Sequence, residues 1–334
     1  MKIKRIINDT FKVALSLFLG GAILYWMYRG FDFKQVEHVM FHEMNWTWML
    51  LSFPFGIMAQ VFRGWRWRQS LEPVGEKPRS STCIHAIFIS YATSLLIPRI
   101  GEFARCAILR RYDKTDFPKA LGTVVAERAI DSLLVLAVAG ITLVSQMRIF
   151  HIFFDQTGTS IDAVIDRFST AGYIVTGICA AAVGVLLHFL FKRMAIYNKV
   201  KETVRGIWQG INSVKRVRNK PLYLFFTLAI WGSYFLHYYL TFFCFESTVS
   251  LGMACAMVTF VVGSIAVIVP TPNGAGPWHF AVKTMLILYA VGSNDALNFV
   301  LIVHSVQTLL VVVLGVYAWI ALAFTHQKET AEMS

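Results

Sequence analysis

Charged residues are scarce in this sequence. They make up 15% of its 334 residues, while hydrophobic residues make up 56% and the mean hydropathy is +0.57. A soluble globular domain carries charge on about a quarter of its residues. Several apolar runs approach the roughly 20 residues that cross a hydrocarbon core as a helix. The composition therefore predicts an all-α, polytopic membrane protein.

Recognisable catalytic motifs are also missing. The sequence has no Gly-rich loop ending in Lys-Ser/Thr, no GxGxxG, no G-x-S-x-G and no H-E-x-x-H. These patterns mark phosphate-binding loops, dinucleotide folds, serine hydrolases and zinc proteases. The longest polar stretch, Lys192 to Lys220, is too short for a soluble catalytic domain. We therefore expect no catalytic residues, and neither an enzyme nor an ATP-driven pump.

Metal-ligating residues are not grouped. The five cysteines lie in or near apolar runs without paired spacing, so neither a disulfide framework nor a zinc site is indicated. The histidines lack metal-ligand spacing, and we expect no metal and no cofactor. A net charge of +12 would suggest nucleic acid in a soluble protein, but here the bases concentrate in loops, as membrane topology requires. We expect a membrane lipid as partner and no nucleic acid; a homo-oligomer stays open.

The apolar sequence divides into six full spans, two interrupted pairs and two surface segments. The segment 31–44 carries apolar residues at helical spacing, and the basic segment 192–220 has one apolar face, so both are expected to lie on the membrane surface. The apolar positions of the first are Phe33, Val36, Met40 and Met44. The six spans are predicted at about 11–28, 46–62, 120–144, 171–191, 222–245 and 297–324.

Proline and glycine interrupt the two remaining apolar runs. The first begins at Ser81, stops at Pro98 and continues as a more polar arm from Ile100 to Leu109. The second, 251–269, stops at P-T-P-N-G-A-G-P-W-H and is followed by another apolar arm. Arms this short are typical of re-entrant hairpins, which enter and leave the membrane on one side. The alternative is eight ordinary spans joined by tight Pro-Gly turns.

The distribution of charge predicts the orientation. Residues 192–220 carry nine bases and one acid, whereas 148–167 carry two bases and three acids. Because basic loops stay in the cytoplasm, both termini are predicted to be cytoplasmic, with the protein in a cytoplasmic membrane. The order of span, surface helix, span, hairpin and span then occurs twice in opposite orientations, as in many secondary transporters. We predict one integral membrane domain, 1–334, with an inverted repeat of 1–145 and 169–325.

Charged residues interrupt the apolar sequence between Ser94 and Asp131. Ionisable groups inside a membrane usually mark a substrate pathway, and guanidinium groups match phosphate oxygens. Pro98 suits the first turn of a helix, where the dipole favours an anion. The alternative is a local ion network, and in either case the hairpin and the third span are expected to touch. The predicted substrate-binding residues here are Arg99, Gly101, Glu102, Arg105, Glu127, Arg128 and Asp131.

The second hairpin offers backbone groups and few charges. Asn273, Gly274 and Gly276 permit backbone shapes that aim successive N–H groups at one anion. His279 and Lys283 are four residues apart on the return arm. All five are predicted substrate-binding residues. The alternatives are a tight turn for the Asn-Gly segment and an outward-snorkelling side chain for Lys283.

These motifs resemble a known family. The segments L-I-P-R-I-G-E-F-A-R and V-V-A-E-R-A-I-D, followed by P-T-P-N-G-A-G-P-W-H, are similar to the flippase-like membrane domain of lysylphosphatidylglycerol synthases, the multiple peptide resistance factor proteins. In that family the second hairpin often ends G-G-x-G-x-x-E, whereas this chain has Asn273 and His279 at the first Gly and the Glu. The role of that acid is therefore not carried over.

The resemblance implies lipid translocation by the membrane region. In two-domain relatives a separate cytoplasmic domain transfers the amino acid from tRNA, and because this sequence shows no such domain, synthase activity is not expected. We predict a flippase or transporter for an amphiphile with an anionic head group, a phospholipid or polyprenyl-phosphate lipid. The alternatives are a membrane-embedded lipid-modifying transferase and a non-transporting partner subunit of a lipid enzyme.

Overall fold

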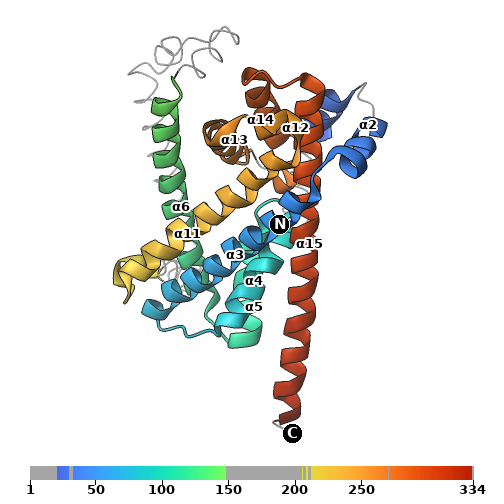
Figure 1. The fold of residues 1–334 in the computed structure, drawn as a ribbon. Coiled ribbons are helices and arrows are strands. Elements are labelled where there is room, and N and C mark those ends of the chain that lie inside the picture. The colour runs from blue at the N-terminus through green and yellow to red at the C-terminus, as the bar shows by residue number, and fades with distance from the viewer. Residues whose placement is uncertain are drawn as a thin grey trace, which may run out of the picture.

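The structure, a computed structural model, describes residues 21–29, 33–147, 205, 208–209, 212–269 and 271–332, with side chains to residue 325. The described residues form helices and turns, with no β-strand among them, which confirms the all-α class. Figure 1 shows the helices crossing one another at steep angles, with α15 (Ser293–Glu332) running along one edge.

In the described part of the chain, seven further helices of at least 12 residues carry the architecture. The shorter elements are α2 (Phe33–His38), the π-helix η1 (Val39–Glu43), η2 (Glu72–Val74), η3 (Val214–Arg216), η4 (Leu240–Cys244), α12 (Glu246–Val249) and η5 (Pro272–Gly274). The longer ones are α3 (Trp46–Leu71), α4 (Ser80–Ser94), α5 (Ile100–Asp113), α6 (Phe117–Ser145), α11 (Lys220–Tyr239), α13 (Gly252–Ala266) and α14 (Pro277–Leu288).

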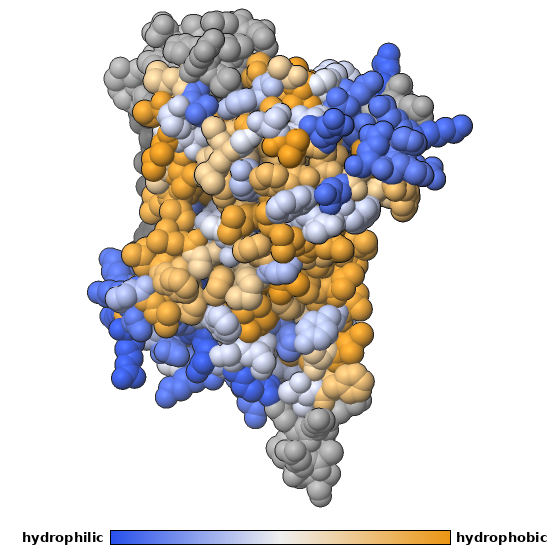
Figure 2. Space-filling view, viewed as in Figure 1, coloured by the Kyte–Doolittle hydropathy of each residue, from blue (hydrophilic) through white to orange (hydrophobic). Residues whose placement is uncertain are grey.

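Hydrophobic surface covers the middle of the face seen in Figure 2. Figure 2 shows hydrophilic surface near α2 and near the junction of α3 with α11, with hydrophobic surface between them. Among the described residues, one segment, 293–325, is by length and composition alone long and apolar enough to cross a membrane, and α13 is a shorter apolar helix. The predicted number of spans stays a prediction.

Helices α3 and α11 pack side by side and run antiparallel (Figure 1). At one end the Asn45 N–H donates to the Cys244 carbonyl over 2.9 Å. Toward the other end the Arg66 guanidinium donates to the Thr227 hydroxyl over 3.2 Å. The helices approach closely at Gly56, where a Cβ would lie 2.9 Å from the His237 ring.

Each interrupted run forms a pair of packed helices, α4 with α5 and α13 with α14. The first pair is tight because Gly101 lies against the carbonyl oxygen of Ser90, where any Cβ would collide with the backbone. Helix α4 also packs on α15, and α13 packs on α6. Each pair therefore contacts the long helix that follows the other pair in the sequence.

Two predicted boundaries are wrong. The second span was expected to end near 62, but α3 continues to Leu71, which places the R-G-W-R-W-R segment inside the helix. The first arm was expected to reach Pro98, but α4 ends at Ser94 and α5 begins at Ile100 with Arg99 as its N-cap. Pro98 therefore lies in the turn that precedes the helix, outside its first turn.

The first predicted surface segment is helical and is anchored in the core. Val39 and Met44 are buried against the cluster that includes Phe299, whereas Phe33 is 60% exposed. The Trp46 indole N–H donates to the Met40 carbonyl over 2.8 Å, which fixes this segment to the start of α3. The fourth span, 171–191, and most of the basic segment 192–220 lie outside the described residues.

Candidate functional site

Three helices bring charged side chains into the interior at one place. Five of them are at most 4% exposed, although ionised groups are rarely buried without partners. Helix α3 contributes two, α5 one and α6 the rest. We call the set the arginine–carboxylate cluster: Arg63, Arg66, Arg105, Glu127, Arg128 and Asp131.

Asp131 is held by three guanidinium groups. Arg63 Nη1 lies 2.6 Å from Oδ2, and Arg66 Nη2 lies 2.8 Å from Oδ1. Arg128, one turn earlier on α6, approaches Oδ2 to 3.0 Å. Charge-assisted hydrogen bonds of this kind strongly favour the ionised carboxylate. Asp131 therefore acts as a fixed negative charge that orders the arginines around it.

Glu127 connects the first hairpin to α6. Arg105 Nη1 donates to Oε2 over 2.9 Å, and Arg66 Nε lies 3.5 Å from Oε1. The Arg105 guanidinium also lies 4.6 Å from the centroid of the Trp67 ring, and the Trp67 indole N–H donates to Thr123 over 2.9 Å. Cation–π contact adds to the ion pair. The expected contact between the hairpin and the third span is thus confirmed.

The cluster has more positive charge than negative. Glu102 adds a third acid, 3.7 Å from Arg128, so four arginines face three carboxylates and the sum is one positive charge. The Nε and Nη2 groups of Arg105 and the Nε groups of Arg63 and Arg128 are buried without hydrogen-bond partners in the described part of the chain. Buried N–H groups are normally paired. The excess charge and these donors suit an added anion.

Arg128 forms the edge of the cluster. Its side chain is 41% exposed, while the side chains of Arg66 and Arg105 are at most 2% exposed. Glu102, its neighbour from α5, is 34% exposed. An anion that enters the cluster from the protein surface would contact the Arg128 guanidinium first.

Arg63 and Arg66 were not predicted as site residues. They lie in R-G-W-R-W-R at the end of an apolar run, and alternating Trp and Arg in that place are typical of a membrane interface. Their spacing of three residues places both on one helix face, and this signal would have indicated a shared partner. Helix α3 continues past both residues, and the face that carries them contacts Asp131.

Arg99 does not join the cluster. It is exposed, has a left-handed φ of 64°, and its Nη2 donates to the Ile268 carbonyl over 3.1 Å. Arg105, and not Arg99, makes the ion pair with an acid of α6. Arg99 links the turn of the first hairpin to the end of α13. Gly101, another predicted residue, provides the close packing of α5 on α4.

The second hairpin contains a tight turn. Asn273, Gly274 and Gly276 have positive φ values of 51°, 71° and 90°. The Gly274 N–H donates to Thr271 over 3.1 Å, and the Ala275 N–H donates to Pro272 over 2.9 Å. Two of the amides that an anion nest would need are therefore used inside the turn. The geometry favours the turn alternative over the nest at this point.

The remaining predicted residues of this hairpin are close to α15. His279 is 3% exposed, and its ring centroid lies 4.4 Å from that of His304. His304 Nε2 is 3.1 Å from the Asn273 carbonyl, and the Asn273 amide donates to Thr308 over 2.7 Å. Lys283 is half-buried one turn beyond His279. In the described residues, none of these side chains bonds to the arginine–carboxylate cluster.

A metal site is not indicated by the described residues, where no group of three or more His, Cys, Asp or Glu side chains is arranged to hold an ion. The buried chemistry of the site is that of guanidinium groups and carboxylates. Such a set can bind an anion or exchange one ion pair for another.

Comparisons with known proteins agree with the resemblance seen in the sequence. The chain is 24% identical over 311 residues to "Glycosyltransferase AglD" of Haloferax volcanii, an alignment that covers 83% of this chain and 50% of that protein. The chain thus spans about half the length of this curated relative. No solved structure shows a significant match. The family model for the lysylphosphatidylglycerol synthase TM region matches residues 13–315, and the chain belongs to that family of membrane proteins.

Proposed function

We propose that this protein is a lipid flippase or related transporter that moves an amphiphile with a phosphate head group across the membrane. The observation that carries the proposal is the buried arginine–carboxylate cluster with its excess positive charge. Burying ions costs several kcal/mol each before pairing. One guanidinium charge of the cluster has no partner carboxylate. A bound anion would neutralise that charge.

Phosphate suits the groups that the cluster offers. A guanidinium donates two parallel N–H bonds to phosphate oxygens, and Arg105 keeps Nη2 and Nε without partners among the described residues. Arg128 can turn from Asp131 toward an incoming head group, because Arg63 and Arg66 still neutralise that carboxylate. Exchange of one ion pair for another lets the head group enter without leaving a buried charge unpaired.

An apolar pocket beside the cluster supports an amphiphilic substrate. It has a volume of about 220 Å³ and lies between α6, α11 and α13. It begins one turn beyond Asp131 at Leu134 and Val135, and next to Thr227 at Leu228. A lipid whose phosphate contacts the arginines would place its first methylene groups there.

The packing pattern supports an inverted repeat of 1–145 and 169–325 within one membrane domain. Helices α3 and α11, equivalent in the two halves, are antiparallel neighbours, and the two hairpins exchange contacts with α15 and α6. We propose six spans and two re-entrant hairpins, with both termini cytoplasmic in a bacterial inner membrane. Arg99 would join the hairpins near the bilayer midplane.

Translocation is proposed here in place of catalysis. Asp131 and Glu127 are each held by arginines, so neither carboxylate is available as a general base. The family is named for the membrane region of a lipid synthase and the relative is named a glycosyltransferase. For this chain, which matches half of that relative, we propose lipid handling without group transfer.

The test is transbilayer movement of labelled phospholipid in liposomes that contain the purified protein. We expect the Arg128→Ala variant to lose at least about tenfold in rate, equal to about 1.4 kcal/mol of lost recognition. Arg68→Ala is the matched control, because Arg68 lies on α3 outside the cluster with a side chain 44% exposed. An unchanged rate in a folded Arg128→Ala variant would remove the proposed site.

Mass spectrometry of the lipids after the same incubation separates the alternatives. Translocation without change in lipid mass supports a transporter. A new lipid mass would instead indicate a transferase, and an inactive protein that requires a stoichiometric partner would indicate a subunit of a lipid enzyme.

A further inference from the structure

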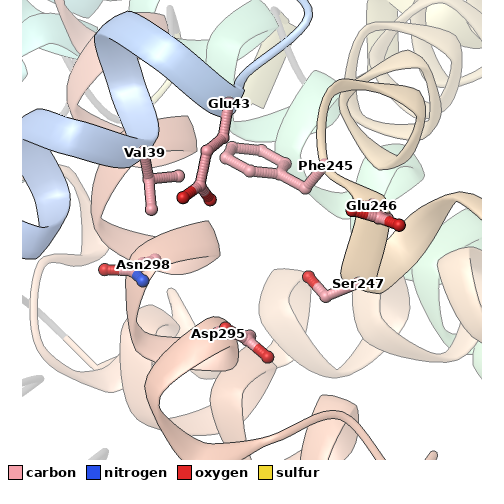
Figure 3. A pocket seen from close by; sticks show the side chains of 7 residues that line it. All are labelled: Val39, Glu43, Phe245, Glu246, Ser247, Asp295 and Asn298. Carbon is pink, nitrogen blue, oxygen red and sulfur yellow. The ribbon is translucent and has the colours of Figure 1, made fainter.

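A polar cavity lies at the opposite end of α3 from the arginine–carboxylate cluster. It has a volume of about 470 Å³ and opens beside η1, α12 and the start of α15 (Figure 3). Glu43 of its wall precedes α3, whereas Arg63 lies 17 residues along that helix. At 1.5 Å per residue the two sites are about 25 Å apart. The cavity therefore belongs to a separate site.

Carboxylates dominate the wall of this cavity. Three elements contribute one acid each: Glu43 from η1, Glu246 from α12 and Asp295 from α15. In the described part of the chain, neither Glu246 nor Asp295 has a basic partner, while Glu43 meets only the His38 ring, 3.1 Å away. The Ser247 hydroxyl and the side chains of Val39 and Phe245 complete the wall. The cavity thus carries uncompensated negative charge.

Asn298 gives an independent indication of a ligand. It is 2% exposed, yet neither its Nδ2 nor its Oδ1 has a hydrogen-bond partner among the described residues. Figure 3 shows its side chain at the edge of the cavity, on the same side as Val39. A buried amide left unpaired is unfavourable. A molecule in the cavity that donates to Oδ1 would remove that penalty.

The arrangement selects the kind of cation. Among the described residues, no group of three or more His, Cys, Asp or Glu side chains is arranged to hold a metal ion, so a metal is not indicated here. A cavity of about 470 Å³ accommodates a small organic molecule. An ammonium group donates three hydrogen bonds, which carboxylates, the Ser247 hydroxyl and the Asn298 Oδ1 can accept.

We propose that this cavity is a binding site for a primary organic amine of lipid head-group size, held by Glu246 and Asp295 with Asn298 as hydrogen-bond acceptor. The predicted topology puts it on the extracytoplasmic side. The site does not depend on the proposed phosphate recognition by the arginines, because it shares no residue with that cluster.

The experiment is saturation-transfer NMR on the full-length protein in detergent, with ethanolamine as probe and uncharged ethylene glycol as its control. We expect transfer to ethanolamine and none to ethylene glycol. The Glu246→Gln, Asp295→Asn double variant should bind ethanolamine about tenfold more weakly, since two partly exposed charges are removed. The matched control is Glu37→Gln, an exposed acid of α2 outside the cavity, which should leave the signal unchanged.

Two further measurements keep the proposal testable. If the double variant does not fold, ethylammonium should displace ethanolamine from the unmodified protein while propanol should not. Equal transfer to ethanolamine and ethylene glycol, or a signal that the double variant keeps, would overturn the site.

Nanodiscs of two lipid compositions distinguish a lipid head group from a soluble amine as the source of the ligand. Ethanolamine signal lost in phosphatidylethanolamine discs but kept in phosphatidylglycerol discs supports a lipid head group as the natural occupant. Signal kept in both supports a soluble amine in the same site. Absence of signal in both types of disc would overturn the proposal for the membrane-embedded protein.

Discussion

The two hairpins have similar architecture and different chemistry. In the first, Arg105 is joined to α6 by an ion pair with Glu127. In the second, the Asn273 side chain and the imidazole of His304 join the turn to α15 through uncharged groups. Both use a close glycine contact or positive φ to reverse the chain. The comparison shows that two similar helix pairs join the rest of the fold through different groups, an ion pair in the first and hydrogen bonds in the second.

Removing the Asp131 carboxylate should be the most damaging change to the arginine–carboxylate cluster. Asp131→Ala would leave Arg63 and Arg66 buried without their strongest partner, and breaking a buried pair costs about 3–5 kcal/mol. We expect loss of folded protein, measured by size-exclusion chromatography after detergent extraction. Glu102→Ala is the control, because its contact with Arg128 is partly exposed and worth at most about 1 kcal/mol. Equal yields for the two variants would contradict this account of the cluster.

Glycine substitutions should distinguish the hairpins next. Gly101→Ala directs a Cβ at the Ser90 carbonyl, which cannot move without shifting α4. We expect a destabilisation of about 3 kcal/mol, at the upper end of overpacking effects. Gly274→Ala meets the Val267 side chain at 2.7 Å and a φ of 71°, and should cost about 1–2 kcal/mol. Thermal unfolding of the two variants side by side measures the difference, and a reversed order would show that the first hairpin is not the more tightly packed.

Substitution at the exposed edge of the cluster should affect transport more than stability. Arg128→Gln keeps Asp131 paired with Arg63 and Arg66, so unfolding should change by about 1 kcal/mol or less. Lipid movement should fall about tenfold, because a head group would lose its first guanidinium contact. Arg128→Lys should recover part of the rate by restoring the charge. If stability falls as much as transport, Arg128 is a structural residue.

The smallest effect is expected from a substitution in the second hairpin. Asn273→Ala removes the hydrogen bond to Thr308 and keeps a left-handed φ of 51° without the asparagine side chain. We expect a loss of about 1–2 kcal/mol and little change in lipid movement, measured in the same liposomes. A transport defect as large as that of Arg128→Gln would place the second hairpin in the recognition site.

Local signals in the sequence predicted much of this fold and part of the site. Proline and glycine marked both hairpin turns, and the acids of α6 were visible as charges in an apolar run. The contact between the first hairpin and α6 followed from the need to pair buried charge. These features depend on residues near one another in the sequence or on strong general rules.

The missed features depend on tertiary contacts. Arg63 and Arg66 are buried because α3 extends past the predicted end of the span and meets α6, and hydropathy gave no sign of that extension. The use of the Gly274 N–H inside its turn follows from backbone angles that composition does not determine. In the first surface segment Val39 is buried, whereas Met40, which helical spacing selected, is only partly buried.

The most direct test of the central claim is head-group selectivity of lipid movement. Phosphatidylglycerol and an uncharged diacylglycerol glycoside with the same acyl chains would be followed in parallel in liposomes that contain the unmodified protein or Arg128→Gln. We predict that the unmodified protein moves the phosphate lipid faster by about tenfold or more, and that Arg128→Gln removes most of this preference. Equal rates for the two lipids, or a preference unchanged in the variant, would contradict phosphate recognition by the arginine–carboxylate cluster.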